Sequence, residues 1–184
     1  MSNRAKRVLM ACAVPVLILA GMCATPLYTL YSGEEIILQT RPLDPSDPLR
    51  GDYVSLQYEA EEVPVGLVEP AITERVKNGE SGLNVYVTLE KKNGIDVPAK
   101  VTMKQPDKGT YLKGTIDYIG VRDTFNGEQT AAGEEVAYIQ YSLDKYFVAD
   151  NTGTKWEEAS AKGEVLAKAK VHNGYAVLTD ILVK

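Results

Sequence analysis

The feature of this sequence that most constrains its fold is an uncharged run of 23 residues, 8–30, near the N-terminus. As an α-helix the run is about 35 Å long, enough to cross the hydrocarbon core of a bilayer, which is about 30 Å thick. Pro15 and Gly21 would weaken a helix in water but are tolerated in a membrane. The run therefore predicts one transmembrane helix, which separates a short tail, 1–7, from an exported domain, 32–184.

Charge predicts the orientation of this helix. Arg4, Lys6 and Arg7 precede the run, and the next basic residue is Arg41. By the positive-inside rule the tail stays in the cytoplasm and the rest of the chain is exported. Three of the 20 basic residues lie in the tail, so the remaining 17 stand against all 25 acidic residues and give the exported part a net charge of −8.

A cleaved signal peptide is the alternative interpretation of the same run. The small-x-small pattern of a cleavage site is hard to find, and Gly21-Met22-Cys23 comes closest to it. Met22 also stands where a lipoprotein would carry a small residue before its cysteine. Because the run is longer than the apolar region of a signal peptide, about 7–15 residues, we expect an uncleaved anchor.

Few residues are available for metal or redox chemistry. Cys12 and Cys23 both lie in the apolar run, so the exported domain has no disulfide. A structural zinc site needs about four Cys or His ligands, and the chain has one histidine, His172, which we place in a solvated hairpin turn. We expect no metal and no cofactor. The acidic balance also argues against nucleic acid as a partner.

Acid pairs are a further candidate for chemistry. Glu34-Glu35, Glu61-Glu62 and Glu134-Glu135 could hold a metal ion or act as acid and base. Turn residues flank these pairs and no histidine is near, so we interpret them as solvated surface.

Alternating apolar and polar residues dominate the exported part, which is typical of half-buried strands. The pattern predicts a mainly β fold, an antiparallel sandwich or barrel-like domain, after the transmembrane helix. In one stripe Leu112, Ile116 and Tyr118 share a face, and Gly114 is expected to mark a bulge. The expected strands lie near residues 36–38, 53–59, 85–89, 99–103, 112–118, 137–141, 165–171 and 175–183.

Turn and capping residues refine this prediction. Asn173-Gly174 is a favoured two-residue turn and predicts a C-terminal hairpin. Two short helices are also expected. One begins at Pro70 and stops at Gly79; the other begins at Thr154 with a capping box and ends before Gly163.

One polar segment, residues 40–59, precedes and enters the second strand. Its prolines keep the approach extended, and Gly51 and Asp52 favour a turn. Leu56 and Tyr58 then face the core and have a structural role, whereas Tyr53 points to the opposite face. Asp44, Arg50, Asp52 and Tyr53 form either a turn tied by ion pairs or a recognition surface, to which Tyr146 would contribute an aromatic edge.

Gly51-Asp52-Tyr53, Leu56 and Tyr58 together read G-D-Y-x-x-L-x-Y. With this motif, the N-terminal span, the strand VYVTLE and Tyr146-Phe147-Val148, the chain resembles the GDYXXLXY family of bacterial membrane-anchored proteins over essentially its whole length. The resemblance implies a location in the bacterial inner (cytoplasmic) membrane. It also implies a multi-pass membrane protein as partner, because members are often encoded beside such proteins.

Two classes of function compete for this sequence. No catalytic constellation is evident, which favours a non-enzymatic binding or accessory subunit of an envelope or membrane complex. The alternative is an enzyme related in fold to signal peptidases, because an anchor followed by Pro-x-Leu-x-Gly-Asp resembles their start. Those enzymes place a nucleophilic serine about eight residues before Gly-Asp. Here position 43 is leucine, and Ser46 is too close to the turn.

Overall fold

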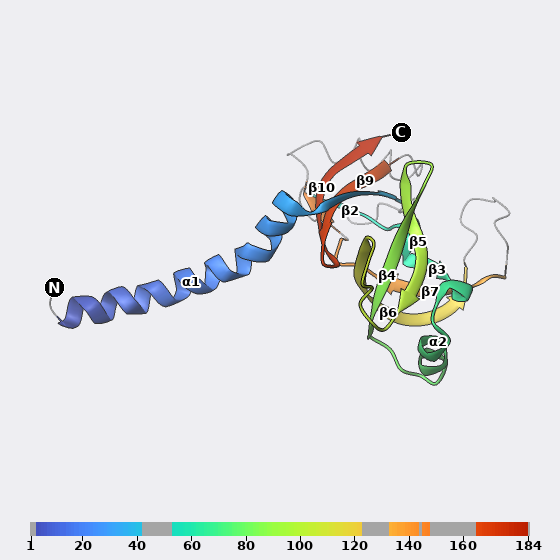
Figure 1. The fold of residues 1–184 in the computed structure, drawn as a ribbon, viewed down its shortest axis with the longest axis horizontal. Helices are drawn as coiled ribbons and strands as arrows, with labels where there is room; N and C mark the ends of the chain where they lie inside the picture. Colours follow the sequence, from blue (N-terminus) through green and yellow to red (C-terminus); the bar gives the residue numbers. More distant parts are fainter. Residues whose placement is uncertain (1–2, 42–52, 123–132, 144, 148–164, 184) are drawn as a thin grey trace.

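Helix α1 (Asn3–Ser32) extends away from a β domain formed by the rest of the chain (Figure 1). The structure, a computed structural model, describes residues 3–41, 53–122, 133–143, 145–147 and 165–183. Within α1, residues Met10–Ser32 are long and apolar enough to cross a membrane, and their most apolar window is not buried against the domain. Pro15 and Pro26 lie inside the helix.

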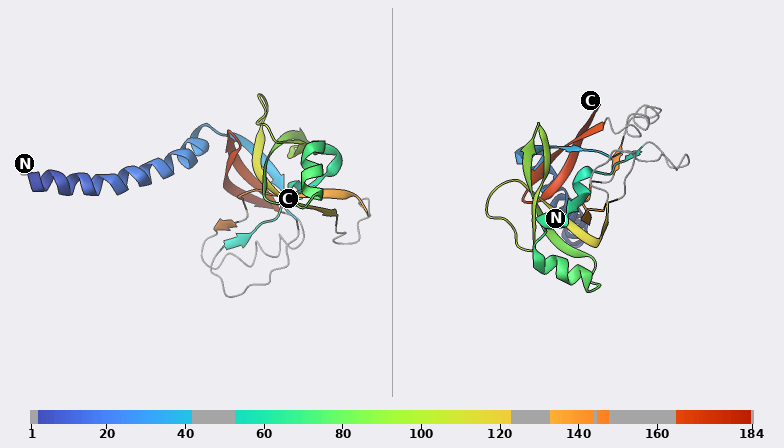
Figure 2. Two further views of the ribbon diagram at one scale, coloured as in Figure 1. Left: turned by 90° about the horizontal axis from the view of Figure 1, so that it is seen from below. Right: turned by 90° about the vertical axis from the view of Figure 1, so that its right-hand side faces the viewer.

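The domain is mainly β with antiparallel sheets, as the sequence predicts. Among the described residues three sheets are formed, with the strand orders β1-β9-β10, β2-β8 and β3-β7-β6-β4-β5. Figure 2 shows the domain that they build from two further sides. The strands are β1 (Glu34–Gln39), β2 (Tyr53–Ser55), β3 (Glu62–Pro64), β4 (Leu83–Lys92), β5 (Ile95–Thr102), β6 (Tyr111–Val121), β7 (Glu135–Gln140), β8 (Lys145–Phe147), β9 (Val165–His172) and β10 (Tyr175–Val183).

The three-stranded and five-stranded sheets curve around one core as a half-barrel. Strand β1 lies beside β5, where the Ile37 N–H donates to Asp96 Oδ2 at 2.8 Å. The buried Asp96 carboxylate thereby accepts from a backbone N–H on the edge of β1 opposite β9. The core beneath both sheets is mostly aliphatic and includes Ile36, Leu38, Val87, Val101, Ile116, Ile139 and Ala167, together with the rings of Tyr58 and Tyr141.

The first predicted short helix is confirmed as α2 (Pro70–Lys77). Pro70 occupies its first turn, and Ile72 and Val76 are its buried side chains. The chain leaves α2 through Gly79, whose φ of 94° is the left-handed conformation that favours glycine. The second predicted helix, from Thr154, lies outside the described residues. Two 3₁₀ turns that the sequence analysis missed, η1 (Glu59–Glu61) and η2 (Val65–Leu67), flank β3.

The predicted C-terminal hairpin is also confirmed. Strands β9 and β10 pair around Asn173-Gly174, whose φ angles of 51° and 78° are both positive. This is the turn geometry that matches strand twist. The same dipeptide, Asn93-Gly94, joins β4 to β5 with φ angles of 53° and 86°.

The predicted bulge in β6 is displaced from Gly114 to Asp117. Gly114 pairs regularly with Val85, whereas the β6–β7 register shifts between Ile116 and Tyr118. Gly114 serves close packing instead, because a Cβ there would stand 2.6 Å from Ile139 Cγ2 and 3.0 Å from a backbone oxygen. The strand predicted for residues 53–59 is shorter than expected and ends at Ser55.

Gly114→Ala tests this packing. We expect the free energy of unfolding to fall by about 1–3 kcal/mol, since the added methyl group overlaps Ile139 and the β7 backbone. Gly66→Ala is the matched control, because nothing lies within 4 Å of its Cβ position. Urea unfolding in detergent, followed by circular dichroism, measures both; equal stability of the two variants would contradict the packing argument.

Candidate functional site

The end of the G-D-Y-x-x-L-x-Y motif lies in the core. Leu56 and Tyr58 are both buried, and the Tyr58 hydroxyl donates to the Leu143 carbonyl at 2.7 Å. The Tyr58 N–H donates to Glu61 Oε2 at 3.1 Å, and its backbone pairs with Thr40 at an isolated bridge. The residues on both sides of segment 42–52 are thereby attached to the core.

The polar part of the motif lies almost wholly outside the described residues. Asp44, Arg50, Gly51 and Asp52 all fall within 42–52, as do position 43 and Ser46 of the alternative enzyme hypothesis. The backbone of Tyr53 pairs with Phe147, and that of Val54 with Tyr146, in the β2-β8 ribbon. The structure thus brings the strands of Tyr53 and Tyr146 together, and the recognition surface proposed for these residues stays a prediction.

Two arginines and two glutamates form a cluster next to two points where the described residues end. Glu62 on β3 is only 7% exposed, and it pairs with Arg41 through Oε1 and with Arg122 Nε, 3.4 Å away, through Oε2. Arg122 also pairs with Glu134 across 3.4 Å. Arg41 immediately precedes segment 42–52, and Arg122 precedes segment 123–132.

This cluster corrects the prediction of solvated surface at Glu62, whereas Glu135 is exposed as predicted. Glu62 is buried because β3 pairs with β7 and places Arg41 and Arg122 over its carboxylate. A buried carboxylate needs such partners, since its desolvation would otherwise be costly. No local pattern marks Glu62, because Arg122 lies 60 residues away in the sequence and approaches only through the strand order.

Tyr118 and Tyr138 form a stacked pair on the outer face of the five-stranded sheet. Their ring centroids are 4.4 Å apart with an interplanar angle of 20°, and Tyr118 is 54% exposed. The prediction that Tyr118 shares a face with Ile116 is wrong, because the extra residue at Asp117 reverses the side-chain alternation. Gly120 leaves room for the pair, since a Cβ there would lie 3.2 Å from both rings.

The charged cluster and the tyrosine pair belong to one surface. In the strand register Glu62 is opposite Tyr138, and Tyr138 is opposite Tyr118, so the three side chains lie in one row across β3, β7 and β6. We call the surface made by Arg41, Glu62, Tyr118, Arg122 and Tyr138 the Tyr–Arg surface. It combines the exposed Tyr118 ring and the half-buried Tyr138 ring with guanidinium groups, and these residue types are enriched at protein interfaces.

A recess also lies where α1 meets the domain. It is an open pocket of about 360 Å³ lined by Ser32, Gly33, Glu34, Gly109, Thr110, Tyr111, Val171, His172, Asn173 and Gly174. Tyr111 is 7% exposed, and its hydroxyl has no hydrogen-bond partner among the described residues. Burial raises the pKa of Tyr111, and the nearby Tyr86 adds to the shift. His172, placed in a solvated turn by the sequence analysis, is half-buried and packs edge-on against Tyr28, with ring centroids 4.8 Å apart.

Ligand sets for a metal are not found in the part of the chain that the structure describes. There, no three His, Cys, Asp or Glu side chains gather closely enough to hold a metal ion. Cys12 and Cys23 are both exposed on α1 as free thiols.

The fold and these sites define a mainly β domain carried on one N-terminal apolar helix. The family model described as GDYXXLXY protein matches residues 15–181, so the chain belongs to the GDYXXLXY family. Comparison with curated proteins and with solved structures gives no match.

Substitution of Glu62 tests the buried cluster. We expect Glu62→Gln to lower the free energy of unfolding by about 2–3 kcal/mol, because two arginines lose their charged partner in a partly buried site. Glu135→Gln is the matched control: its pair with Lys77 is half exposed and should contribute less than about 1 kcal/mol. Similar losses of unfolding free energy in both variants would show that the buried cluster stabilises the fold no more than an exposed ion pair does.

Tyr141 predicts how stability depends on alkaline pH. Its hydroxyl is buried and donates to the Ala60 carbonyl at 2.9 Å, and burial, with a smaller effect from Glu61, raises its pKa far above the ordinary value of about 10. The folded state therefore keeps a proton that the unfolded state releases. The contribution of Tyr141 to the free energy of unfolding is therefore fully present below about pH 10 and falls as the pH rises above it.

Tyr141→Phe should make this alkaline decline shallower while lowering stability at neutral pH by about 1 kcal/mol, the usual contribution of a hydrogen bond. Urea unfolding between neutral and alkaline pH measures both effects. Tyr175→Phe, at an exposed ring, is the control and should follow the wild type. A Tyr141→Phe variant with an unchanged alkaline decline would contradict the assignment.

Proposed function

We propose that this protein is a single-pass membrane protein whose β domain lies outside the cytoplasm, where it serves as a binding or accessory subunit of a membrane or envelope complex. The observation that carries the proposal is α1, whose apolar side chains are exposed along most of Met10–Ser32, while the domain contacts the last turn of the helix. Lipid tails would cover the exposed apolar side chains. The proposed division is a tail at 1–7, a span at 8–30 and a domain at 32–184.

Orientation and membrane follow from charge and family. The basic residues Arg4, Lys6 and Arg7 before the span support a cytoplasmic N-terminus. Membership of the GDYXXLXY family favours the bacterial cytoplasmic membrane, and the resemblance to its members favours a multi-pass membrane protein as partner.

We assign the domain to binding rather than to catalysis, and the Tyr–Arg surface supports this. Stacked tyrosine rings provide apolar area with few rotatable bonds, and a neighbouring guanidinium group can pair with polar groups of a partner. Segment 42–52, which contains most of the predicted recognition residues, adjoins the same surface through Arg41. Partner contact would therefore extend from Tyr118 and Tyr138 to the motif.

Topology is tested with single cysteines in a Cys12→Ser/Cys23→Ser background. A membrane-impermeant maleimide should label Lys108→Cys in intact spheroplasts but Asn3→Cys only after lysis. The intact mass of the membrane protein should include residues 1–23. Labelling of Asn3→Cys in intact spheroplasts would reverse the orientation, and loss of the N-terminal segment would identify a signal peptide.

Partner binding is tested by affinity purification from the membrane fraction. We expect the wild type to retain a multi-pass protein and Tyr118→Ala/Tyr138→Ala to lose most of it, since the double substitution removes the stacked rings. Asp52→Ala/Tyr53→Ala tests the motif separately.

Met103→Ala is the matched control, because Met103 is an exposed apolar residue outside the Tyr–Arg surface. It should retain the partner. If the tyrosine variant also retains it, the Tyr–Arg surface is not the binding site; if both double variants retain it, the motif is excluded as well.

A further inference from the structure

The junction between α1 and the β domain has no flexible linker. Helix α1 ends at Ser32 and β1 begins at Glu34, so Gly33 alone separates them. The Gly33 N–H donates to the Thr29 carbonyl at 2.8 Å, which continues the helical hydrogen bonding into the first residue before the sheet. A Cβ on Gly33 would stand 2.3 Å from the Thr29 oxygen and 3.1 Å from the Val171 oxygen, so only glycine permits this close passage.

Side chains from the β9–β10 hairpin hold the last turn of α1. Lys170 Nζ donates to the Leu30 carbonyl at 2.7 Å, which satisfies a helix-end acceptor with a cation. The Tyr28 ring packs edge-on against His172, and Thr29 is almost completely buried between the two elements. These contacts set one orientation of the domain relative to the helix axis.

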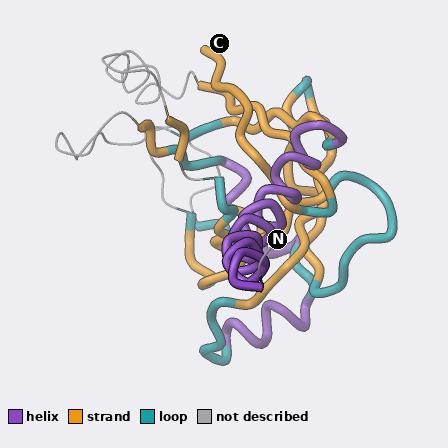
Figure 3. Tube along the Cα trace, turned by 90° about the vertical axis from the view of Figure 1, so that its left-hand side faces the viewer, coloured by secondary structure: helices purple, strands orange, loops and turns teal. Residues whose placement is uncertain are grey.

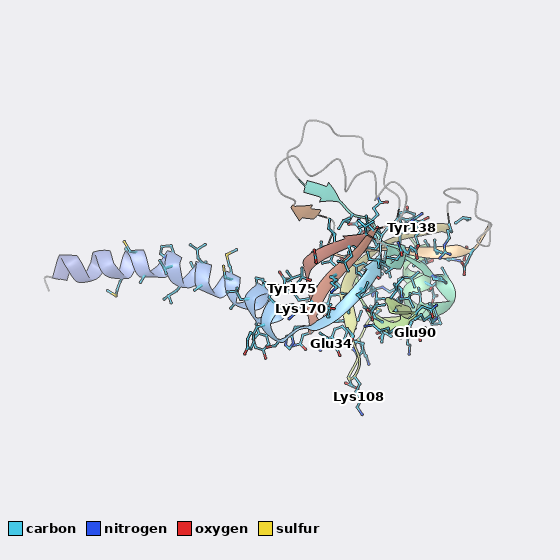
Figure 4. All side chains as sticks on the ribbon, turned by 90° about the horizontal axis from the view of Figure 1, so that it is seen from above. Glu34, Glu90, Lys108, Tyr138, Lys170 and Tyr175 are labelled. Carbon is cyan, nitrogen blue, oxygen red and sulfur yellow. The ribbon has the colours of Figure 1, made fainter. Side chains whose placement is uncertain are left out.

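Exposed tyrosines surround this junction. Tyr28 and Tyr31 on α1 are 55% and 89% exposed, and Tyr175 at the start of β10 is 43% exposed. Figure 4 shows Tyr175 and Lys170 beside the end of α1, whereas Tyr138 and Glu90 lie farther from the helix. Figure 3, viewed from the N-terminal side, shows the domain spreading on several sides of α1. Tyrosine is enriched where a membrane meets water.

The pocket at the junction gives this surface a polar floor. Its lining includes Glu34 and Thr110, whose side chains hydrogen-bond to each other, and His172 and Asn173, whose side chains are also in polar contact. Such polar groups are satisfied by water or by headgroup oxygens rather than by a hydrocarbon chain. The surface is therefore suited to the polar headgroup layer and not to the bilayer core.

We propose that the end of α1 and the β9–β10 turn form one lipid-contact surface that lies in the phospholipid headgroup layer and fixes the orientation of the β domain on the bilayer. This inference rests on the proposed function, in that α1 must span the membrane. Its consequence is that Tyr28, Tyr31, His172 and Tyr175 contact headgroups, while the Tyr–Arg surface is held at a constant height above them. Basic and acidic groups are mixed at the junction, so the contact should not require anionic lipid.

The test uses the full chain in phosphatidylcholine nanodiscs, with Cys12→Ser/Cys23→Ser and one spin-labelled cysteine. A label at Tyr175→Cys should be protected from a water-soluble nickel chelate and retain contact with oxygen, which concentrates in lipid. Glu90→Cys, an exposed site away from the junction, is the matched control. The chelate should reach this label freely and make its signal much harder to saturate. Equal chelate access at Tyr175→Cys and Glu90→Cys would overturn the proposal.

A third label separates this inference from the proposed function. Leu19→Cys lies within the apolar stretch of α1 and should be accessible to oxygen alone. If Leu19→Cys is protected but Tyr175→Cys is open to the chelate, the helix spans the membrane and the lipid-contact surface is wrong. If Leu19→Cys is itself open to the chelate, α1 does not span and the proposed function fails with it.

Discussion

Gly33 alone separates the apolar helix α1 from the first strand of the β domain, and the rest of the structure depends on the contacts at this junction. Because Gly33 carries no side chain, the Thr29 carbonyl and the Val171 carbonyl can both approach it closely. Lys170 then completes the hydrogen bonding at the helix end. The β9–β10 hairpin, which builds one edge of the domain, therefore also holds the end of α1.

From this junction the fold organises the candidate site. Strand β1 (Glu34–Gln39) follows Gly33, and beyond its far end Thr40 bridges to Tyr58 and Arg41 pairs with Glu62. The G-D-Y-x-x-L-x-Y motif therefore has a structural part, because Leu56 and Tyr58 lie in the core after segment 42–52. Arg41, which precedes this segment, belongs to the Tyr–Arg surface.

Local sequence signals predicted most of the strands, α2 and the Asn173-Gly174 hairpin, because alternation, capping and turn chemistry act over a few residues. They failed where distant strands decide the outcome. The bulge at Asp117 turns Tyr118 outward, and Glu62 is buried by arginines brought together through the β3-β7-β6 order. Neither feature has a local signature, so the Tyr–Arg surface could not be predicted. The predicted residues Asp44, Arg50 and Asp52 lie outside the described chain.

The contacts at the junction fix the domain to its helix rather than leaving it tethered by a flexible segment. Electron–electron distance measurements between spin labels at Leu19→Cys and Glu90→Cys, in a Cys12→Ser/Cys23→Ser background in nanodiscs, test this rigid attachment most directly. A single narrow distance distribution is predicted, and a flexible Gly-Ser insertion after Ser32 should broaden it. A broad distribution in the chain without the insertion would contradict the account, because the contacts of Gly33 and Lys170 would then not hold the domain.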